Sequence, residues 1–188
     1  MIGSTLAFLS LFLAIFLPNA CQKSQTRTFY AICSGTFTTR ARAEERASAM
    51  QNAGGGGFIR KSGTFQVLSA VYTDKSDCES VLDGLGEGHA ALPLKVRAHG
   101  EDLSRIVSAL AKIYYGLDGG KKTAEQALSE LSAFLAEERF PDRLKEQEGE
   151  TVREIFDALG ELTDSHLSVN LKYFQIALVC AFAEGGKP

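Results

Sequence analysis

Residues 28–50 read TFYAICSGTFTTRARAEERASAM, and residues 63–85 read GTFQVLSAVYTDKSDCESVLDGL. The second segment repeats the first at an offset of 35 positions, and an internal repeat indicates the architecture before any single residue does. Each copy has the pattern of a strand, a turn closed by an aromatic residue, and an amphipathic helix. The matched pairs are Ser34 and Ser69, Phe37 and Tyr72, Thr38 and Thr73, Arg40 and Lys75, and Glu44 and Glu79.

The two copies and the segments around them predict one small α+β module. Helices are expected over 39–52 and 75–85, and the side chain of Asp74 is expected to cap the second. The expected strands are 29–34, 58–61, 64–71 and 92–98. This β-α-β-β-α-β order predicts a split-βαβ sheet that is covered on one face by two helices. The other face of the sheet is then open, and a ligand could lie there.

Residues 101–188 carry apolar residues at helical spacing and predict an all-α helical domain. Gly119 ends its first helix, and Thr123 with Gln126 forms a capping box at the start of the second. The last helix, near 167–183, is apolar on more than one side. This pattern predicts a buried place at the centre of a helix bundle rather than a membrane span.

The composition is that of an ordinary globular protein and excludes several classes of function. The chain is 45% hydrophobic and 23% charged, and its net charge of −3 gives no general attraction to nucleic acid. RNA-recognition modules share the predicted strand order, but residues 64–68 lack their basic-Gly-aromatic run. No HExxH, GxSxG or phosphate-binding glycine loop occurs. We therefore predict a protein that is not an enzyme, with no cofactor, no metal and no nucleic-acid partner.

An almost purely apolar run, TLAFLSLFLAIFL, occupies residues 5–17. With its flanks the run approaches the roughly 20 residues that span a bilayer. Three interpretations stay open: an uncleaved signal anchor, a cleaved signal peptide, and a lipoprotein signal that ends at Cys21. Pro18 and Asn19 suit a cleavage site poorly, which favours the anchor. All three export the rest of the chain, and the anchor predicts a single-pass protein of the cell membrane with extracytoplasmic domains.

The four cysteines are widely spaced and form no CxxC pair, which argues against a zinc or thioredoxin-type motif. Cys78 falls on the apolar face of the helix predicted at 75–85, and Cys180 falls in the apolar run of the last helix. We predict that both are buried free thiols that act as small hydrophobic residues.

Further motifs lie within the repeat region. They are Ser34-Gly35-Thr36-Phe37, Gly55-Gly56-Gly57-Phe58-Ile59, and the helix and turn residues Ala43, Glu44, Ala47, Met50, Tyr72, Cys78, Glu79, Leu82 and Leu85. With these motifs, residues 28–98 resemble the SPOR (sporulation-related repeat) domain family. The resemblance implies a βαββαβ fold that binds septal peptidoglycan and prefers glycan strands stripped of stem peptides. Many members of the family are bitopic membrane proteins with this domain outside the membrane.

The resemblance and the apolar run together predict the domain organisation. Residues 1–20 form a signal anchor or signal peptide, and residues 21–27 form a linker. A SPOR-like domain follows at 28–98, and a helical domain occupies 101–188.

In the resembling family the glycan lies on the open face of the sheet, and strand alternation indicates which side chains share that face. Ile32 and Val67 are repeat-equivalent and should face the two helices. The glycan-binding candidates on the open face are Cys33, Gln66, Leu68, Lys95 and Arg97. The polar members would bond sugar hydroxyls, and the cysteine and leucine would supply apolar surface.

We therefore expect a peptidoglycan-binding module that localises a membrane-anchored protein at the division septum or during sporulation. Its expected partners are denuded glycan strands, the membrane through the N-terminal apolar segment, and a protein partner at the helical domain. One alternative stays open: a protein–protein interaction adaptor of the cell envelope whose glycan groove has degenerated.

Overall fold

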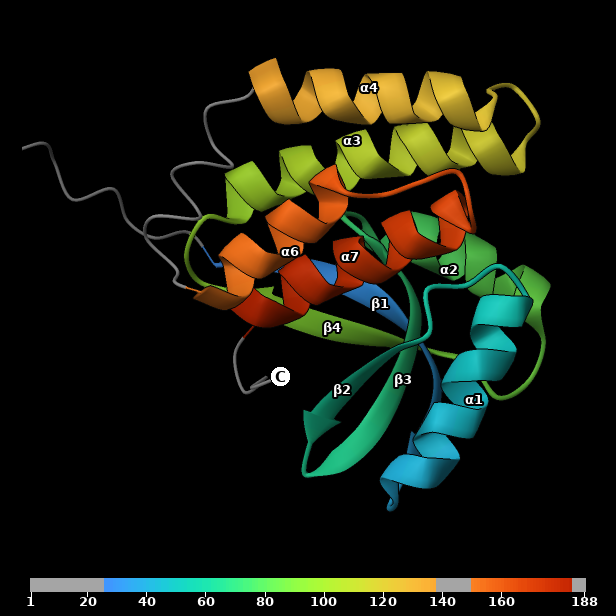
Figure 1. Ribbon diagram of the computed structural model, residues 1–188. Coiled ribbons are helices and arrows are strands. Elements are labelled where there is room, and N and C mark those ends of the chain that lie inside the picture. The colour runs from blue at the N-terminus through green and yellow to red at the C-terminus, as the bar shows by residue number, and fades with distance from the viewer. Residues whose placement is uncertain (1–25, 138–149, 184–188) are drawn as a thin grey trace, which may run out of the picture.

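The computed structural model describes residues 26–137 and 150–183, and the fold is α+β. Within these residues a four-stranded antiparallel sheet combines with six helices (Figure 1). The strands are β1 (Arg27–Phe37), β2 (Phe58–Ser62), β3 (Thr64–Tyr72) and β4 (Ala90–Val96). The helices are α1 (Arg40–Asn52), α2 (Lys75–Leu85), α3 (Gly100–Asp118), α4 (Ala124–Glu137), α6 (Glu150–Gly160) and α7 (Leu167–Phe182). The N-terminal run at 5–17 lies outside the described residues.

The strands pair in the order β2-β3-β1-β4, and every pair of neighbours is antiparallel. Along the chain, α1 follows β1 and α2 follows β3. The helices predicted at 39–52 and 75–85 match α1 and α2 almost residue for residue. The first strand is longer than predicted, and β4 begins and ends two residues earlier than the predicted 92–98.

The centre of the sheet lies between the two copies of the repeat. Cys33 on β1 is directly opposite Leu68 on β3, and these two positions are repeat-equivalent. The register shifts on each side of this pair. On one side Ser69 is an extra residue on β3, and on the other side the two β1 residues Ser34 and Gly35 lie opposite the single β3 residue Val67. Repeat-equivalent serines therefore lie at both β-bulges.

The helices of the repeat cover one face of the sheet, named here the α1–α2 face. Val67 packs with Ala43 and Ala47 of α1 in one small apolar cluster. Ile32 packs with Tyr72 and with Cys78 of α2 in another. The prediction that Ile32 and Val67 face the two helices is confirmed.

The opposite face is not open, and that prediction is wrong. Helices α3 and α7 pack against it, and we name it the α3–α7 face. Strand residues of this face are fully buried in one core with the helices; they are Phe29, Ala31, Leu68, Leu94 and Val96. The segments predicted as two domains thus share a single hydrophobic core, because apolar residues of α3 and α7 find their partners on the sheet.

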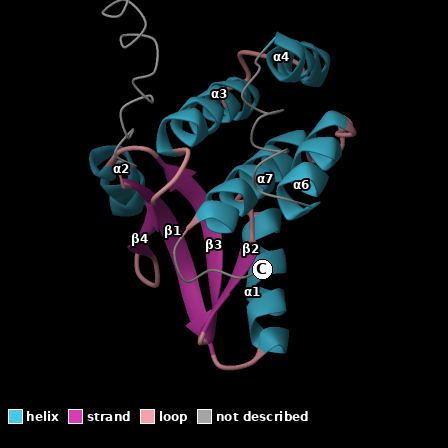
Figure 2. Ribbon diagram, turned by 90° about the vertical axis from the view of Figure 1, so that its left-hand side faces the viewer, coloured by secondary structure: helices cyan, strands magenta, loops and turns pink. Residues whose placement is uncertain are grey.

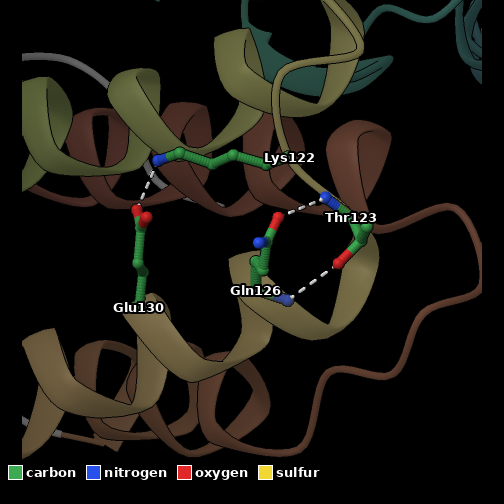
Figure 3. Close-up of polar contacts among 4 residues, drawn as sticks. All are labelled: Lys122, Thr123, Gln126 and Glu130. Carbon is green, nitrogen blue, oxygen red and sulfur yellow. Dashed lines mark hydrogen bonds and ion pairs between the residues drawn. The ribbon is translucent and has the colours of Figure 1, made fainter.

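The C-terminal helices form two layers over this face, with α3 and α7 next to the sheet and α4 farthest from it (Figure 2). Helix α7 is buried on several sides, as predicted, because it packs against the sheet, α3 and α6. The predicted capping box of α4 is confirmed (Figure 3): the Thr123 amide donates to Gln126 Oε1 at 3.0 Å, and the Gln126 amide donates to Thr123 Oγ1 at 3.3 Å. An ion pair of Lys122 with Glu130 lies beside it.

The glycine run before β2 lets the chain pass closely under α7. The Gly56 amide donates to the Ser69 carbonyl at 2.7 Å. A Cβ atom on Gly56 would lie 2.9 Å from both the Tyr173 amide nitrogen and the Ile176 side chain of α7. Lys172 of α7 also donates to the Gly54 carbonyl at 2.7 Å. The glycines therefore connect the repeat to the C-terminal helices.

The start of α2 differs from the prediction in one contact. Asp74 is the N-cap residue, but its side chain accepts no hydrogen bond from the amides of the first turn. It accepts one from the Thr73 hydroxyl instead, at 2.9 Å. The predicted side-chain cap at Asp74 is therefore wrong, although the helix begins where expected.

Candidate functional site

The centre of the predicted glycan site lies beneath the C-terminal helices. Leu68 has none of its side chain exposed, and neighbouring Ala31 is equally buried. Both belong to the core shared with α3 and α7. With the helices in place, Leu68 offers no apolar surface to a ligand.

Two other predicted residues lie at the edge of this buried area. Cys33 is partly buried; its thiol donates to the Gly35 carbonyl at 3.4 Å and lies 3.8 Å from Thr36 Oγ1. Gln66 is also partly buried and accepts a hydrogen bond from Arg60 Nη1 at 3.3 Å. Cys33, Gln66 and Leu68 thus share one face, as predicted, but only its border can be reached from outside.

The two basic candidates do not join this group. On β4, Leu94 and Val96 are the residues that face the shared core. Strand alternation then directs Lys95 to the opposite side of the sheet, and its side chain is exposed there. Arg97 follows the last residue of β4 and is exposed. The structure therefore separates Lys95 from Gln66 and Leu68, in contrast to the predicted arrangement.

The lower ends of β2 and β3 extend beyond α7 in Figure 1 and leave a small part of the α3–α7 face uncovered. Thr36, Thr64 and Gln66 line this end, and each keeps some exposed surface. Hydroxyl and amide groups there can bond sugars or a polypeptide.

A deeper site lies on the other side of the sheet, between α1 and α2. This cleft has a volume of about 370 Å³. Its floor is formed by β1 and β3, and its walls by Met50, Val81, Leu85, Tyr114 and Tyr115. We call it the α1–α2 cleft. It exists because the repeat helices form two separate apolar clusters and leave the space between them unfilled.

A chain of hydrogen bonds runs along the floor of the cleft. The Ser34 hydroxyl donates to Ser69 Oγ at 3.1 Å, and the Ser69 hydroxyl donates to the Ile32 carbonyl at 3.4 Å. His89 Nδ1 lies 3.0 Å from Ser34 Oγ. Since each hydroxyl has one hydrogen to donate, Nδ1 must be the donor to Ser34, which leaves Nε2 of a neutral imidazole as an acceptor. Of these three polar side chains, Ser69 and His89 line the cleft.

Charged and phenolic groups complete the wall near α3. Lys172 Nζ lies 2.6 Å from Asp118 Oδ2, and Ser168 donates to the other oxygen of the same carboxylate. Burial is the main cause that raises the pKa of Tyr72 and of Tyr114, and the neighbouring phenol of Tyr115 raises both further. Both phenols therefore stay protonated at neutral pH and can act as hydrogen-bond donors.

The α1–α2 cleft was not predicted from the sequence. The repeat paired Ser34 with Ser69, which was a usable signal, because a serine within a buried strand needs a hydrogen-bond partner. His89 had no comparable signal, since it lies between two secondary-structure elements.

The thiols behave as predicted where the structure describes them. Cys78 and Cys180 are free and buried. Burial raises the pKa of both, and that of Cys180 reaches about 12. Neither is therefore poised as a nucleophile at neutral pH. Cys21 lies outside the described residues.

Two absences hold for the described ranges, 26–137 and 150–183. No helix there is both long enough and apolar enough to cross a bilayer. In the same part of the chain, no group of three or more His, Cys, Asp or Glu side chains is placed to hold a metal ion.

Comparisons with known proteins give no family. No protein-family model matches the chain, no curated protein matches it, and no solved structure matches it.

Proposed function

We propose that this protein is a non-enzymatic interaction module of the cell envelope that contacts a protein partner through the α1–α2 cleft. One observation carries the proposal. Among the described residues, the large hydrophobic side chains that are exposed are Val81, Leu85 and Tyr115, at 37%, 44% and 49%, and all three line this cleft. Apolar surface gathered at one concave place is a mark of an interaction site.

The covered sheet supports the adaptor over the glycan receptor. A ligand on the α3–α7 face would have to displace α3 and α7 from a core in which Ala31, Leu68 and Leu94 are almost fully buried. Separating such a core would cost a large part of the stability of a small protein. Recognition through the α1–α2 cleft requires no such displacement.

The proposed fold is the split-βαβ module of the SPOR-like type. The order β1-α1-β2-β3-α2-β4 and the strand order β2-β3-β1-β4 support it. The proposed location is the cell membrane with the folded part outside, and it is supported by the apolar run at 5–17.

The adaptor is tested by site-specific crosslinking in cells. A photo-crosslinking residue is placed at Leu85 or Tyr115 of the full-length protein, with Ser132 on the outer helix α4 as the control position. We expect one and the same protein, identified by mass spectrometry, to crosslink from both cleft positions and not from the control. Val81→Asp should abolish both crosslinks, because it places a charge on the apolar wall. Equal crosslinking from Ser132 would contradict the proposal.

Glycan binding is the second candidate, and the uncovered end of the α3–α7 face favours it. Thr36, Thr64 and Gln66 remain accessible there. Full-length protein should then sediment with denuded sacculi, and Gln66→Ala should weaken sedimentation several-fold, as the loss of about 1 kcal/mol implies. Sedimentation without any crosslink from the cleft would replace the adaptor with the glycan receptor.

A further inference from the structure

A second cavity, of about 320 Å³, lies between β2, α6 and α7. Its walls are mostly apolar, and the principal lining residues are Phe58, Ile155, Ala158, Tyr173, Phe174 and Ala177. The rings of Phe58 and Tyr173 meet edge to face at 5.3 Å and close one side. Neither α1 nor α2 contributes to this cavity, so a ligand bound in it would be independent of the proposed partner cleft.

One charged side chain is buried at this cavity. Arg60 is 8% exposed, and it is the only Asp, Glu, Lys or Arg that is buried among the described residues. Its Nη1 donates to the amide oxygen of Gln66 at 3.3 Å, and it takes part in further interaction as well. A guanidinium carries five N–H donors in a planar fork, which suits two parallel hydrogen bonds to a carboxylate.

The remaining polar residues of the cavity set the orientation of a ligand. Thr151 and Glu154 lie on the exposed side of α6, so they mark the outer rim. The Glu154 carboxylate repels an anion at the rim, and Arg60 attracts one at the buried end. Sugars and nucleotides need many hydrogen-bond partners, and these walls offer few. An alkyl chain needs none.

We propose that this cavity binds a free fatty-acid anion, with its carboxylate on Arg60 and its alkyl chain between α6 and α7. The carboxylate would join or replace the present contacts of the guanidinium. The chain would be removed from water by the phenylalanine, tyrosine and alanine side chains of the walls.

Binding is measured on the full-length protein in nanodiscs, with isotopically labelled dodecanoate as the probe. Dodecanol and dodecylammonium serve as neutral and cationic probes of the same length. Ala177→Trp fills the cavity, and binding to this variant gives the background of the lipid; circular dichroism confirms that it is folded. Arg60→Gln removes the charge but keeps a polar side chain.

We expect saturable dodecanoate binding to the unsubstituted protein above the Ala177→Trp background. Dodecanol should bind about tenfold or more weakly, because the charge-assisted hydrogen bond is lost. Dodecylammonium should also bind more weakly than dodecanoate, because Arg60 repels its head group from the buried end of the cavity. Arg60→Gln should weaken dodecanoate by a similar factor and leave dodecanol unchanged. Equal dodecanoate binding by folded Ala177→Trp would overturn the proposal. So would equal affinity of the unsubstituted protein for dodecanoate and dodecanol, a result that needs no Arg60 variant to fold.

Discussion

The two faces of the sheet are covered by helices of different origin. On the α1–α2 face, the helices of the repeat make two small clusters and leave a cleft between them. On the α3–α7 face, helices outside the repeat build one continuous core. The repeat therefore supplies the two central strands and the two helices beside the cleft, and the C-terminal helices supply most of the residues of the larger core. The face that was predicted to be open thus carries the larger core of this protein.

The largest expected effect comes from a charge placed in the larger core. Leu68→Asp should abolish cooperative unfolding, since an unpaired buried charge costs about 5 kcal/mol or more, comparable to the whole stability of a small protein. Lys95→Asp, on the exposed side of β4, should change stability by less than about 0.5 kcal/mol. Thermal denaturation followed by circular dichroism measures both. A native-like melt of Leu68→Asp would mean that the α3–α7 face is open.

Gly56 tests the contact between the repeat region and helix α7. Gly56→Ala should destabilise the protein by roughly 1–3 kcal/mol, because the new methyl group meets the backbone of α7. Gly84→Ala is the matched control in α2, where a Cβ atom meets nothing within 4 Å. It should stabilise the protein by about 0.5–1 kcal/mol through helix propensity. Chemical denaturation gives both values, and equal effects of the two changes would argue against close packing at Gly56.

A smaller effect is expected at the floor of the α1–α2 cleft. Ser34→Ala and Ser69→Ala should each cost about 1 kcal/mol, because each removes a hydrogen bond between buried groups. The double variant should cost less than the sum, by roughly 0.5–1.5 kcal/mol, since the two residues share one bond. A double-mutant cycle by chemical denaturation measures this coupling. Strict additivity would show that the bond contributes nothing.

The smallest effect is expected at pH 8, where labelling by a thiol reagent reports burial and the raised pKa of Cys180 does not yet affect stability. In Cys21→Ser protein at pH 8, Cys33 should be labelled by a thiol reagent well before Cys78 and Cys180, because the latter are buried. Burial raises the pKa of Cys180 from 9.0 to about 12, so the folded state keeps the proton that the unfolded state loses. The contribution of this thiol to the free energy of unfolding is therefore fully present below pH 9 and is lost as the pH rises toward 12. Mass spectrometry of labelled peptides measures the order, and early labelling of Cys180 would contradict its burial.

The repeat made much of the module predictable. Alternation within each copy placed Ile32 and Val67 on the helix-covered face, and helical periodicity located α1 and α2. These features depend on residues close in sequence, where the local periodicity of apolar residues reports which face is buried.

The cover of the second face was not predicted, although the sequence carried a signal for it. β3 is apolar on both faces, at Val67 and Leu68, which is typical of a strand buried on both sides. On β4, the alternating apolar residues Leu92, Leu94 and Val96 indicated a covered face. The prediction placed the side with Lys95 on the ligand face, and it therefore assigned the two sides of this strand the wrong way round. Which helices cover a face depends on contacts between residues far apart in sequence, and periodicity does not report those.

The pairing at the centre of the sheet has a consequence for the symmetry of the module. Cys33 opposes Leu68, and Ser34 bonds Ser69, so two residues meet their own repeat equivalents. Equivalent residues of two copies lie opposite each other when an approximate two-fold rotation relates the copies. Here the axis passes through the sheet between β1 and β3. Two separate copies of one strand-and-helix half would make the same contacts across a dimer interface. The module therefore has the internal symmetry of a fused homodimer. The pairing of cysteine with leucine breaks this symmetry on the face that packs against the C-terminal helices.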